Sequence, residues 1–238
     1  YIVFTDGKTV LPAAAARDHK AVFDGDQGPN TGGMGTYSCD DILGPALERE
    51  VLKKVIQPVI DGMRAEGYPF KGILYAGLML TERGPRVLEF NVRMGDPECQ
   101  VILPRLRSDF AELCAAVCDG RLAEYKAEWS PDAAVCVVLA SGGYPGHYER
   151  GKTITGLDMA AENPRVAVFH AGTRLEGDAI VTNGGRVLGV TALDRDLAGA
   201  IVQAYEGVNK IHFDGMQYRR DIGAKGLKPG APPADPRP

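Results

Sequence analysis

The chain has 238 residues and a formal net charge of −4, which allows one large domain or two smaller ones with a sizeable core. Its lysines and arginines are not clustered, and this argues against a nucleic-acid partner. No apolar run is long enough to span a membrane, so we expect no membrane partner. Five cysteines without a C-x-x-C pair indicate a reducing compartment, the cytoplasm.

The first residues predict a β-hairpin over Ile2–Pro12, because Asp6-Gly7 is a strong turn signal between two apolar runs. Tyr1 already lies in the middle of this pattern, with neither a methionine nor a capping residue before it. We therefore expect the chain to be a fragment of a longer protein. The strand at Ile2–Phe4 would then lack a partner and form an edge that is prone to association.

Residues 13–41 are expected to form a long, structured loop. It carries Arg17-Asp18-His19-Lys20 and then the glycine-rich segment Gly28–Gly35. So many glycines allow the backbone N–H groups to come close to an anion. The segment is not a P-loop, because no Gly-Lys-Ser/Thr follows it. The alternative is a flexible surface loop, although loops of this length in compact domains are more often functional.

The clearest helix is expected over Leu47–Ala65, with Pro58 bending or interrupting it. Ile73–Leu80 is nearly all apolar and predicts a buried central strand. A turn at Glu82–Gly84 returns the chain into the next strand. If that turn has three residues, Gly77 lies opposite Glu89 and leaves room for a ligand.

The stretch Val87–Glu98, VLEFNVRMGDPE, holds the strongest candidate site in the sequence. Residues two apart on a strand share a face, so we expect Glu89, Asn91 and Arg93 to point the same way. The strand then ends in a turn, Gly95–Glu98, that carries two more acids. The alternate apolar residues are expected to face a core: Leu88, Phe90 and Val92.

A carboxylate, an amide and a guanidinium in line suit a metal-bound phosphate. Carboxylate and amide oxygens are hard ligands, and Mg²⁺ takes one or two of them together with phosphate and water. Arg93 would meet a phosphate or a carboxylate with its planar fork of donors. The alternative is an edge strand with an ordinary polar outer face.

A second unit is expected from about Ser130, where the pattern changes to several short strands separated by glycine-rich turns. A helix over Leu197–Ile211 follows them. The tail from Lys228 is rich in Pro and Ala and is predicted to be disordered. The strands are expected at residues 134–140, 166–172, 179–182 and 187–193.

A series of stretches in chain order resembles the glycinamide ribonucleotide synthetase family, also called phosphoribosylamine–glycine ligases, of the ATP-grasp superfamily. The resemblance covers nearly the whole chain to about Gly226. An ordered series is far more specific than any single motif. The stretches are LPAAAARDHK, GPNTGGMG, LYAGLML, LEFNVRMGDPE, GGYPG, FHAGT and TNGGRVLGVTAL.

The resemblance implies an α+β fold, in which the second half of an ATP-grasp core, an antiparallel sheet with helices, is followed by a small β-rich C-terminal domain. Residues 1–129 would be the ATP-grasp part, 130–227 the C-terminal domain and 228–238 a disordered Pro-rich tail. The N-terminal part of the same enzyme, with the lid that clamps ATP, would be missing. The chain alone is therefore expected to bind ATP weakly and not to ligate glycine.

The resemblance also implies an activity: ligation of glycine to 5-phosphoribosylamine, with ATP as co-substrate and glycyl phosphate as intermediate, in de novo purine biosynthesis. Glu89 and Asn91 match the family's Mg²⁺ or Mn²⁺ ligands. Arg93 matches the arginine that would stabilise the transferring phosphoryl group. The residues expected on the substrate side are Asp18, His19, Lys20, Asn30, Thr31, Gly32, Gly33, Gly95 and Asp96.

Two other functions stay open at this point. One is a different ATP-grasp carboxylate–amine ligase that shares the metal-binding strand but takes another acid and amine. The other is a non-catalytic fragment, because the resemblance places the nucleotide lid outside this chain. A substrate screen discriminates the first alternative, and nucleotide titration discriminates the second.

Overall fold

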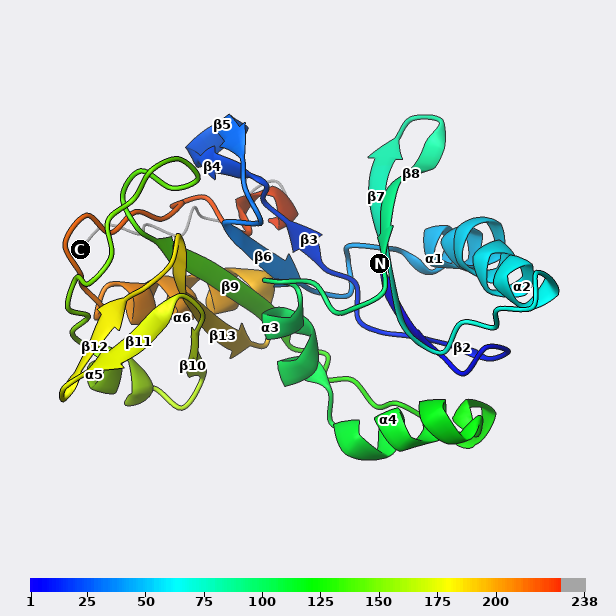
Figure 1. Ribbon diagram of the computed structural model, residues 1–238. Coiled ribbons are helices and arrows are strands. Elements are labelled where there is room, and N and C mark those ends of the chain that lie inside the picture. The colour runs from blue at the N-terminus through cyan, green and yellow to red at the C-terminus, as the bar shows by residue number, and fades with distance from the viewer. Residues whose placement is uncertain (228–238) are drawn as a thin grey trace. The chain divides into compact units, whose positions relative to one another are not determined.

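The computed structural model describes residues 1–227, which form two compact units that interleave along the sequence (Figure 1). The tail from residue 228, for which the sequence predicts disorder, lies outside the described residues. Within residues 1–227, no helix is both long and apolar enough to cross a membrane. The first unit comprises residues 1–15, 40–95 and 105–130, and the second comprises, of the described residues, 16–39, 96–104 and 131–227.

The first unit is built on a four-stranded antiparallel sheet with the order β2-β1-β7-β8. The predicted hairpin is confirmed, and the Asp6 carboxylate accepts the backbone N–H groups of Lys8 and Thr9 in its turn (3.1 and 2.8 Å). Strand β1 lies between two partners and is wholly buried, so the expectation of an exposed edge there is wrong. The strands are β1 (Ile2–Thr5), β2 (Val10–Pro12), β7 (Gly72–Thr81) and β8 (Gly84–Asn91).

One long helical stretch packs its apolar side on this sheet, as the sequence predicts. Pro58 cannot donate a backbone hydrogen bond, and a π-helical turn stands immediately before the segment that contains it. On another side of the unit, Phe110 meets Phe4 edge-on at 6.2 Å. The helices are α1 (Pro45–Val51), the π-turn η2 (Leu52–Ile56), α2 (Gln57–Ala65), α4 (Phe110–Asp119) and the 3-10 turn η4 (Leu122–Glu124).

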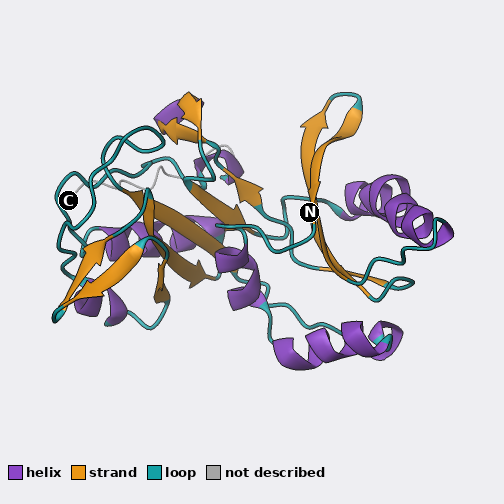
Figure 2. Cartoon of the chain, viewed as in Figure 1, coloured by secondary structure: helices purple, strands orange, loops and turns teal. Residues whose placement is uncertain are grey.

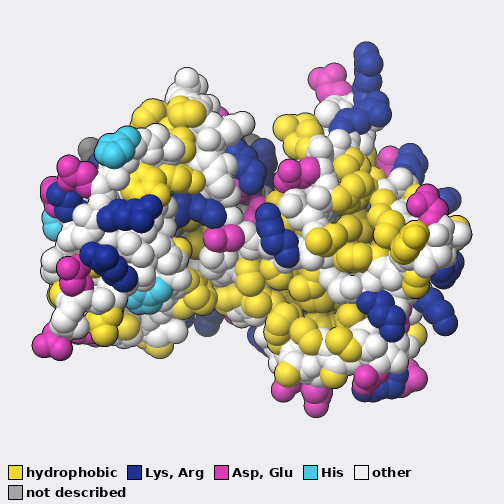
Figure 3. Space-filling view, viewed as in Figure 1, with side chains coloured by type: hydrophobic (Ala, Val, Ile, Leu, Met, Phe, Trp, Pro, Cys, Tyr) yellow, Lys and Arg dark blue, Asp and Glu magenta, His cyan; other side chains and the backbone are white. Residues whose placement is uncertain are grey.

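The β7–β8 hairpin confirms one expectation and corrects two. Gly77 pairs with Glu89 as expected, although the turn has two residues and a bulge between the pairs restores the register. Strand β7 is not buried along its length, because only Leu74 and Ala76 are covered. The alternate face of β8 is not a core face either: Leu88, Phe90 and Val92 are 64%, 42% and 70% exposed, and Figure 3 shows hydrophobic side chains gathered over this hairpin.

The exposure of Leu88 sets the expected cost of shortening it. Leu88→Ala should change the free energy of unfolding by no more than about 0.5 kcal/mol, because an exposed side chain loses little burial. Leu113→Ala, at a fully buried position of α4, should cost about 2–5 kcal/mol. Urea unfolding of the two variants measures the difference, and a Leu88 cost as large as that of Leu113 would contradict the exposed placement.

The second unit is built on a five-stranded antiparallel sheet with the order β10-β13-β9-β6-β3. Every residue of the central strand β9 is buried, and helix α6 packs against β9 and β13 (Figures 1 and 2). The Asp196 side chain caps α6 by accepting the Gly199 N–H at 2.8 Å. The predicted second-unit strands and helix are confirmed within a few residues at their ends. The sequence analysis missed the strand β11, which pairs with β12.

Residues 13–41, expected as a long, structured loop, include four short strands. They contain two paired strands of their own and two strands of the five-stranded sheet. The remaining elements are β3 (Arg17–Asp18), β4 (Ala21–Phe23), η1 (Asp24–Asp26), β5 (Gln27–Asn30), β6 (Gly35–Ser38), α3 (Cys99–Ile102), η3 (Leu103–Arg105), β9 (Ala133–Ala140), α5 (Leu157–Ala161), β10 (Val166–His170), β11 (Thr173–Glu176), β12 (Ala179–Thr182), β13 (Arg186–Asp194), α6 (Leu197–Val208) and η5 (Ala224–Gly226).

Candidate functional site

The predicted polar line lies at the end of β8, in the first unit. Asn91 Nδ2 donates to Glu89 Oε1 at 3.1 Å, and Arg93 Nη2 donates to Asn91 Oδ1 at 3.3 Å. Arg93 Nη1 also donates to the Met94 carbonyl at 2.9 Å. The alternation of a strand therefore brings the three side chains together as the sequence predicts, each bonded to the next and open to solvent.

The donor set at this line suits a divalent cation that also binds phosphate. Glu89 uses one carboxylate oxygen for Asn91, and its second oxygen makes no hydrogen bond within residues 1–227. Gly77 stands opposite, where a Cβ would lie 3.1 Å from the Glu89 side chain. The described residues hold no group of three His, Cys, Asp or Glu arranged for a metal.

The second unit holds Asp18 in a nearly buried position. Its carboxylate pairs with Lys20 Nζ at 2.6 Å and accepts the His19 N–H at 2.7 Å. Burial raises the pKa of Asp18 to about 6, and the negative charge of Glu98 adds to this, while the Lys20 charge opposes it. Lys20 itself is about half exposed, so its ammonium can meet a second anion at the surface.

The glycine-rich segment does not offer the free N–H groups that the sequence analysis expected. The Thr31 N–H donates to the Lys20 carbonyl (2.8 Å), the Gly33 N–H to Thr31 Oγ1 (2.9 Å) and the Met34 N–H to the His19 carbonyl (2.9 Å). The segment is therefore fixed in part by the carbonyls of His19 and Lys20. Within it, Gly28, Pro29, Asn30 and Gly32 are exposed.

Two residues that the sequence analysis did not single out hold this segment. Arg186 Nη1 donates to the carbonyls of Gly32 (3.1 Å), Gly33 (3.4 Å) and Asp96 (2.7 Å), and its Nη2 pairs with the Asp96 carboxylate at 3.1 Å. Tyr144 Oη accepts the Gly32 N–H at 3.2 Å. Both residues lie in stretches that carry the family resemblance, GGYPG and TNGGRVLGVTAL, and that was the available signal.

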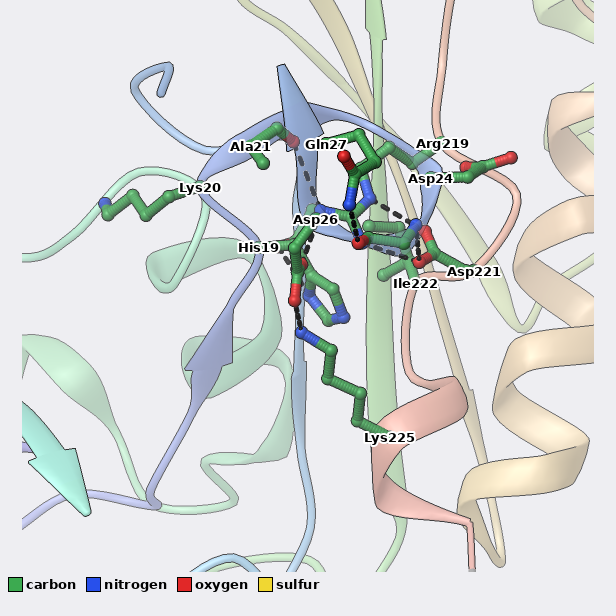
Figure 4. A network of polar contacts seen from close by, with 12 residues as sticks. His19, Lys20, Ala21, Asp24, Asp26, Gln27, Arg219, Asp221, Ile222 and Lys225 are labelled. Atoms are coloured by element: carbon green, nitrogen blue, oxygen red, sulfur yellow. Dashed lines mark hydrogen bonds and ion pairs between the residues drawn. The ribbon is translucent and has the colours of Figure 1, made fainter. Parts of the chain in front are cut away.

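His19 is 1% exposed and so is not open to a ligand in this structure. Its Nδ1 lies 3.3 Å from the Gly35 carbonyl, and its ring packs against Tyr37. Figure 4 shows it beside a charged network that joins η1 to the C-terminal segment, with Arg219 at its centre. Burial lowers the pKa of His19 to about 4, and the positive charges of Arg219 and Lys225 add to this.

The low pKa predicts that His19 stays neutral at pH values where a free histidine is half charged. Its ring signal in an NMR titration should move near pH 4 and not near 6.5. Between these values the unfolded chain binds more protons at this site, so His19 reduces stability as the pH falls. The raised pKa of Asp18 acts in the opposite direction, and the ring signal is therefore the direct measurement. A midpoint above pH 6 would contradict the buried placement.

Two domain models of one family match the chain. The model for the "Phosphoribosylglycinamide synthetase, ATP-grasp (A) domain" matches residues 1–99, and the model for the C domain matches residues 134–225. The chain belongs to the phosphoribosylglycinamide synthetase family. This assignment confirms the family expected from the ordered motifs. The α+β fold expected with it agrees with the crystal structure of the Thermotoga maritima ligase.

Relatives in this family carry the name phosphoribosylamine–glycine ligase. The chain is 51% identical to that of Allochromatium vinosum over 95% of its own length and 53% of the relative's. It is 53% identical to that of Streptomyces coelicolor over 93% and 54%. The crystal structure of the Thermotoga maritima ligase has a TM-score of 0.81 at 36% identity and covers 92% of this chain and 54% of that one. The chain thus spans about half the length of the curated relatives that it matches.

Within the chain, the predicted site residues fall into the two units. Glu89, Asn91, Arg93 and the buried Gly95 belong to the first unit. In the second unit, Asp18 and Lys20 pair with each other and Thr31 bonds the Lys20 carbonyl. The second-unit candidates are Asp18, His19, Lys20, Asn30, Thr31, Gly32, Gly33 and Asp96.

Proposed function

We propose that the chain is the C-terminal part of a phosphoribosylamine–glycine ligase that acts in the cytoplasm. The whole enzyme joins glycine to 5-phosphoribosylamine with ATP in de novo purine biosynthesis. The observation that carries the proposal is the bonded line Glu89–Asn91–Arg93 in a chain about 50% identical to ligases named for this reaction. The five free cysteines agree with a reducing compartment.

The proposed reaction needs activation of a carboxylate before an amine can attack it. A glycine carboxylate oxygen attacks the γ-phosphorus of ATP, and the bond to ADP breaks to give glycyl phosphate. The nitrogen of phosphoribosylamine then attacks the acyl carbon, loses a proton, and phosphate leaves. A Mg²⁺ or Mn²⁺ ion held by Glu89 and Asn91 would neutralise charge on the β- and γ-phosphates.

The proposed roles of the side chains follow from their chemistry. The Arg93 guanidinium donates to Asn91, one of the two proposed metal ligands. Its positive charge is suited to stabilise the negative charge that spreads over the transferring phosphoryl group. In the second unit, Lys20, Asn30 and Asp96 are exposed residues and would bind the small substrates, although the Asp96 carboxylate also accepts from Arg186 and Gln100. Asp18 would orient Lys20, while His19, which is buried, would support Gly35.

The experiment is a chimera in which this chain follows the N-terminal half of the Allochromatium vinosum ligase, joined at the residue that aligns with Tyr1. We expect the chimera to release ADP only when glycine and phosphoribosylamine are both present, and to form glycinamide ribonucleotide. The intact relative is the positive control. The 238-residue chain alone should give no ADP and only weak ATP binding.

Two results would count against the proposal. A folded chimera that releases ADP with another acid or amine, and not with glycine and phosphoribosylamine, would indicate a different ATP-grasp ligase. A folded chimera that binds no nucleotide would indicate that this chain does not complete a catalytic site. Circular dichroism of each preparation establishes that it is folded.

A further inference from the structure

The guanidinium of Arg186 donates hydrogen bonds to the glycine-rich segment and to Asp96. Three of its acceptors are backbone carbonyls, at Gly32, Gly33 and Asp96, and the fourth is the Asp96 carboxylate. Gly32 and Arg186 are separated by 154 positions in the sequence, so this contact joins distant parts of the chain. Carbonyls that converge on one cation repel each other when the cation is removed, because the negative ends of their dipoles lie close together.

Two glycines in this segment leave room for Arg186 and for the residues next to it. A Cβ at Gly32 would lie 3.0 Å from the guanidinium carbon of Arg186. Gly33 has φ = +124°, and a Cβ there would lie 2.6 Å from Pro97 and 2.8 Å from the Asp18 carboxylate. Side chains at these positions would displace Arg186 or Asp18, so the two glycines allow the close approach.

A second contact, from Tyr144, fixes the other side of Gly32. Its hydroxyl accepts the Gly32 N–H, and its ring stands over Gly185, where a Cβ would lie 2.3 Å from it. Gly185 directly precedes Arg186. The turn before β13 therefore supports the tyrosine and the arginine together, and the two residues bond the N–H and the carbonyl of the same glycine.

We propose that Arg186 is a positioning residue: it holds the Gly32-Gly33 backbone and Asp96 in the conformation that receives the amine substrate. This inference rests on the proposed ligase function for the identity of the substrate. Arg186 would act through these groups and not by touching the reacting atoms, since both of its terminal nitrogens, Nη1 and Nη2, already donate to them. Removing it should affect substrate binding more than the chemical step.

The first arm of the test measures the loop in the full 238-residue chain. Arg186→Ala should speed hydrogen exchange of the Gly32, Gly33 and Met34 amides by about tenfold or more, because unpaired acceptors favour local opening. Amides of β9 should keep their protection. Arg186→Lys should give exchange rates between those of the wild type and Arg186→Ala, because one ammonium cannot reproduce the planar fork of donors. Arg174→Ala, which removes an exposed arginine whose side chain pairs, among residues 1–227, only with Glu176, is the matched control.

The second arm measures kinetics in the chimera defined above. Arg186→Ala should raise the KM for phosphoribosylamine about tenfold with kcat changed less than about twofold, and millimolar guanidinium should restore part of the loss. Unchanged amide exchange, a uniform rise across the unit, or a fall in kcat at constant KM would each overturn the proposal. If the alanine variant does not fold, the lysine variant decides by the same criteria. An inactive wild-type chimera counts against the ligase function alone, and the exchange arm still decides whether Arg186 holds the loop.

Discussion

Glu89→Gln in the chimera should lower the rate of glycinamide ribonucleotide formation by at least about a hundredfold, since it removes a charge that faces the proposed cation. Glutamine keeps the size of the side chain and one carbonyl oxygen, so the change isolates the charge. Asn91→Ala should have a similar effect because it removes the oxygen of the second proposed metal ligand and the hydrogen-bond partner of Arg93. Initial rates over a range of Mg²⁺ concentrations measure both variants.

A matched control lies in the same hairpin. Glu82→Gln changes an exposed acid in the turn between β7 and β8, and it should leave the rate unchanged. Glu89 is itself exposed, so the free energy of unfolding should move by no more than about 0.5 kcal/mol. Wild-type turnover of Glu89→Gln at low Mg²⁺ would show that the metal assignment is wrong.

The candidate metal line could be predicted because it depends only on local geometry. Side chains two residues apart on a strand share a face, and Glu89, Asn91 and Arg93 follow that spacing, although β8 itself ends at Asn91. The pairing of Gly77 with Glu89 was expected only for a three-residue turn, because the turn sets which residues face each other. The actual turn is shorter than expected, and the bulge in β8 compensates for it.

The burial of the opposite face could not be predicted in the same way. An apolar alternation shows which residues share a face, but it does not show whether anything covers that face. In the first unit the buried cluster on this sheet includes Leu74 and Ala76 of β7, while Phe90 and Val92 of β8 are exposed. Burial of a strand depends on the elements that pack on it, and sequence alternation carries no such information.

The glycine-rich segment shows a different limit of prediction from sequence. Its glycines indicate close approach of the backbone, and the structure has that approach, with Arg186, Pro97 and Asp18 as the close neighbours. Glycine tolerates any close neighbour equally, so its presence cannot identify the neighbour. The contact with Arg186 joins distant parts of the sequence, and only the fold brings them together.

Substitution of Arg219 is expected to cause a large loss of folding stability. It is 0% exposed, and its guanidinium forms a bidentate pair with Asp221 at 2.7 and 2.6 Å. It also donates to Asp26 and to the Ala21 carbonyl, both at 3.1 Å. The network joins β4 and η1 to the C-terminal segment (Figure 4), and Asp26 is also paired with Lys225.

Arg219→Ala should therefore destabilise the second unit by about 3–5 kcal/mol, because removing one partner leaves buried polar groups and a carboxylate uncompensated. Arg219→Lys should lose less, since it keeps the charge but not the bidentate geometry. Arg220→Ala is the control: its side chain is exposed and only its backbone N–H bonds Asp24. Urea unfolding followed by NMR signals of Val137 and Ile201 reports the second unit directly.

The pH dependence gives this prediction a second measurement. Burial alone would raise the pKa of Asp221, but the hydrogen bonds from Arg219 and from the Gly25 N–H outweigh it and bring the pKa to about 2. A carboxylate with a lowered folded-state pKa stabilises the fold above its unfolded value and loses that contribution as the pH falls through the folded value. The difference in unfolding free energy between wild type and Arg219→Ala should thus shrink as the pH falls from about 4 to about 2. A difference below about 1 kcal/mol at pH 7, or one that does not change in acid, would mean that this ion-pair network is not what holds η1 to the C-terminal segment.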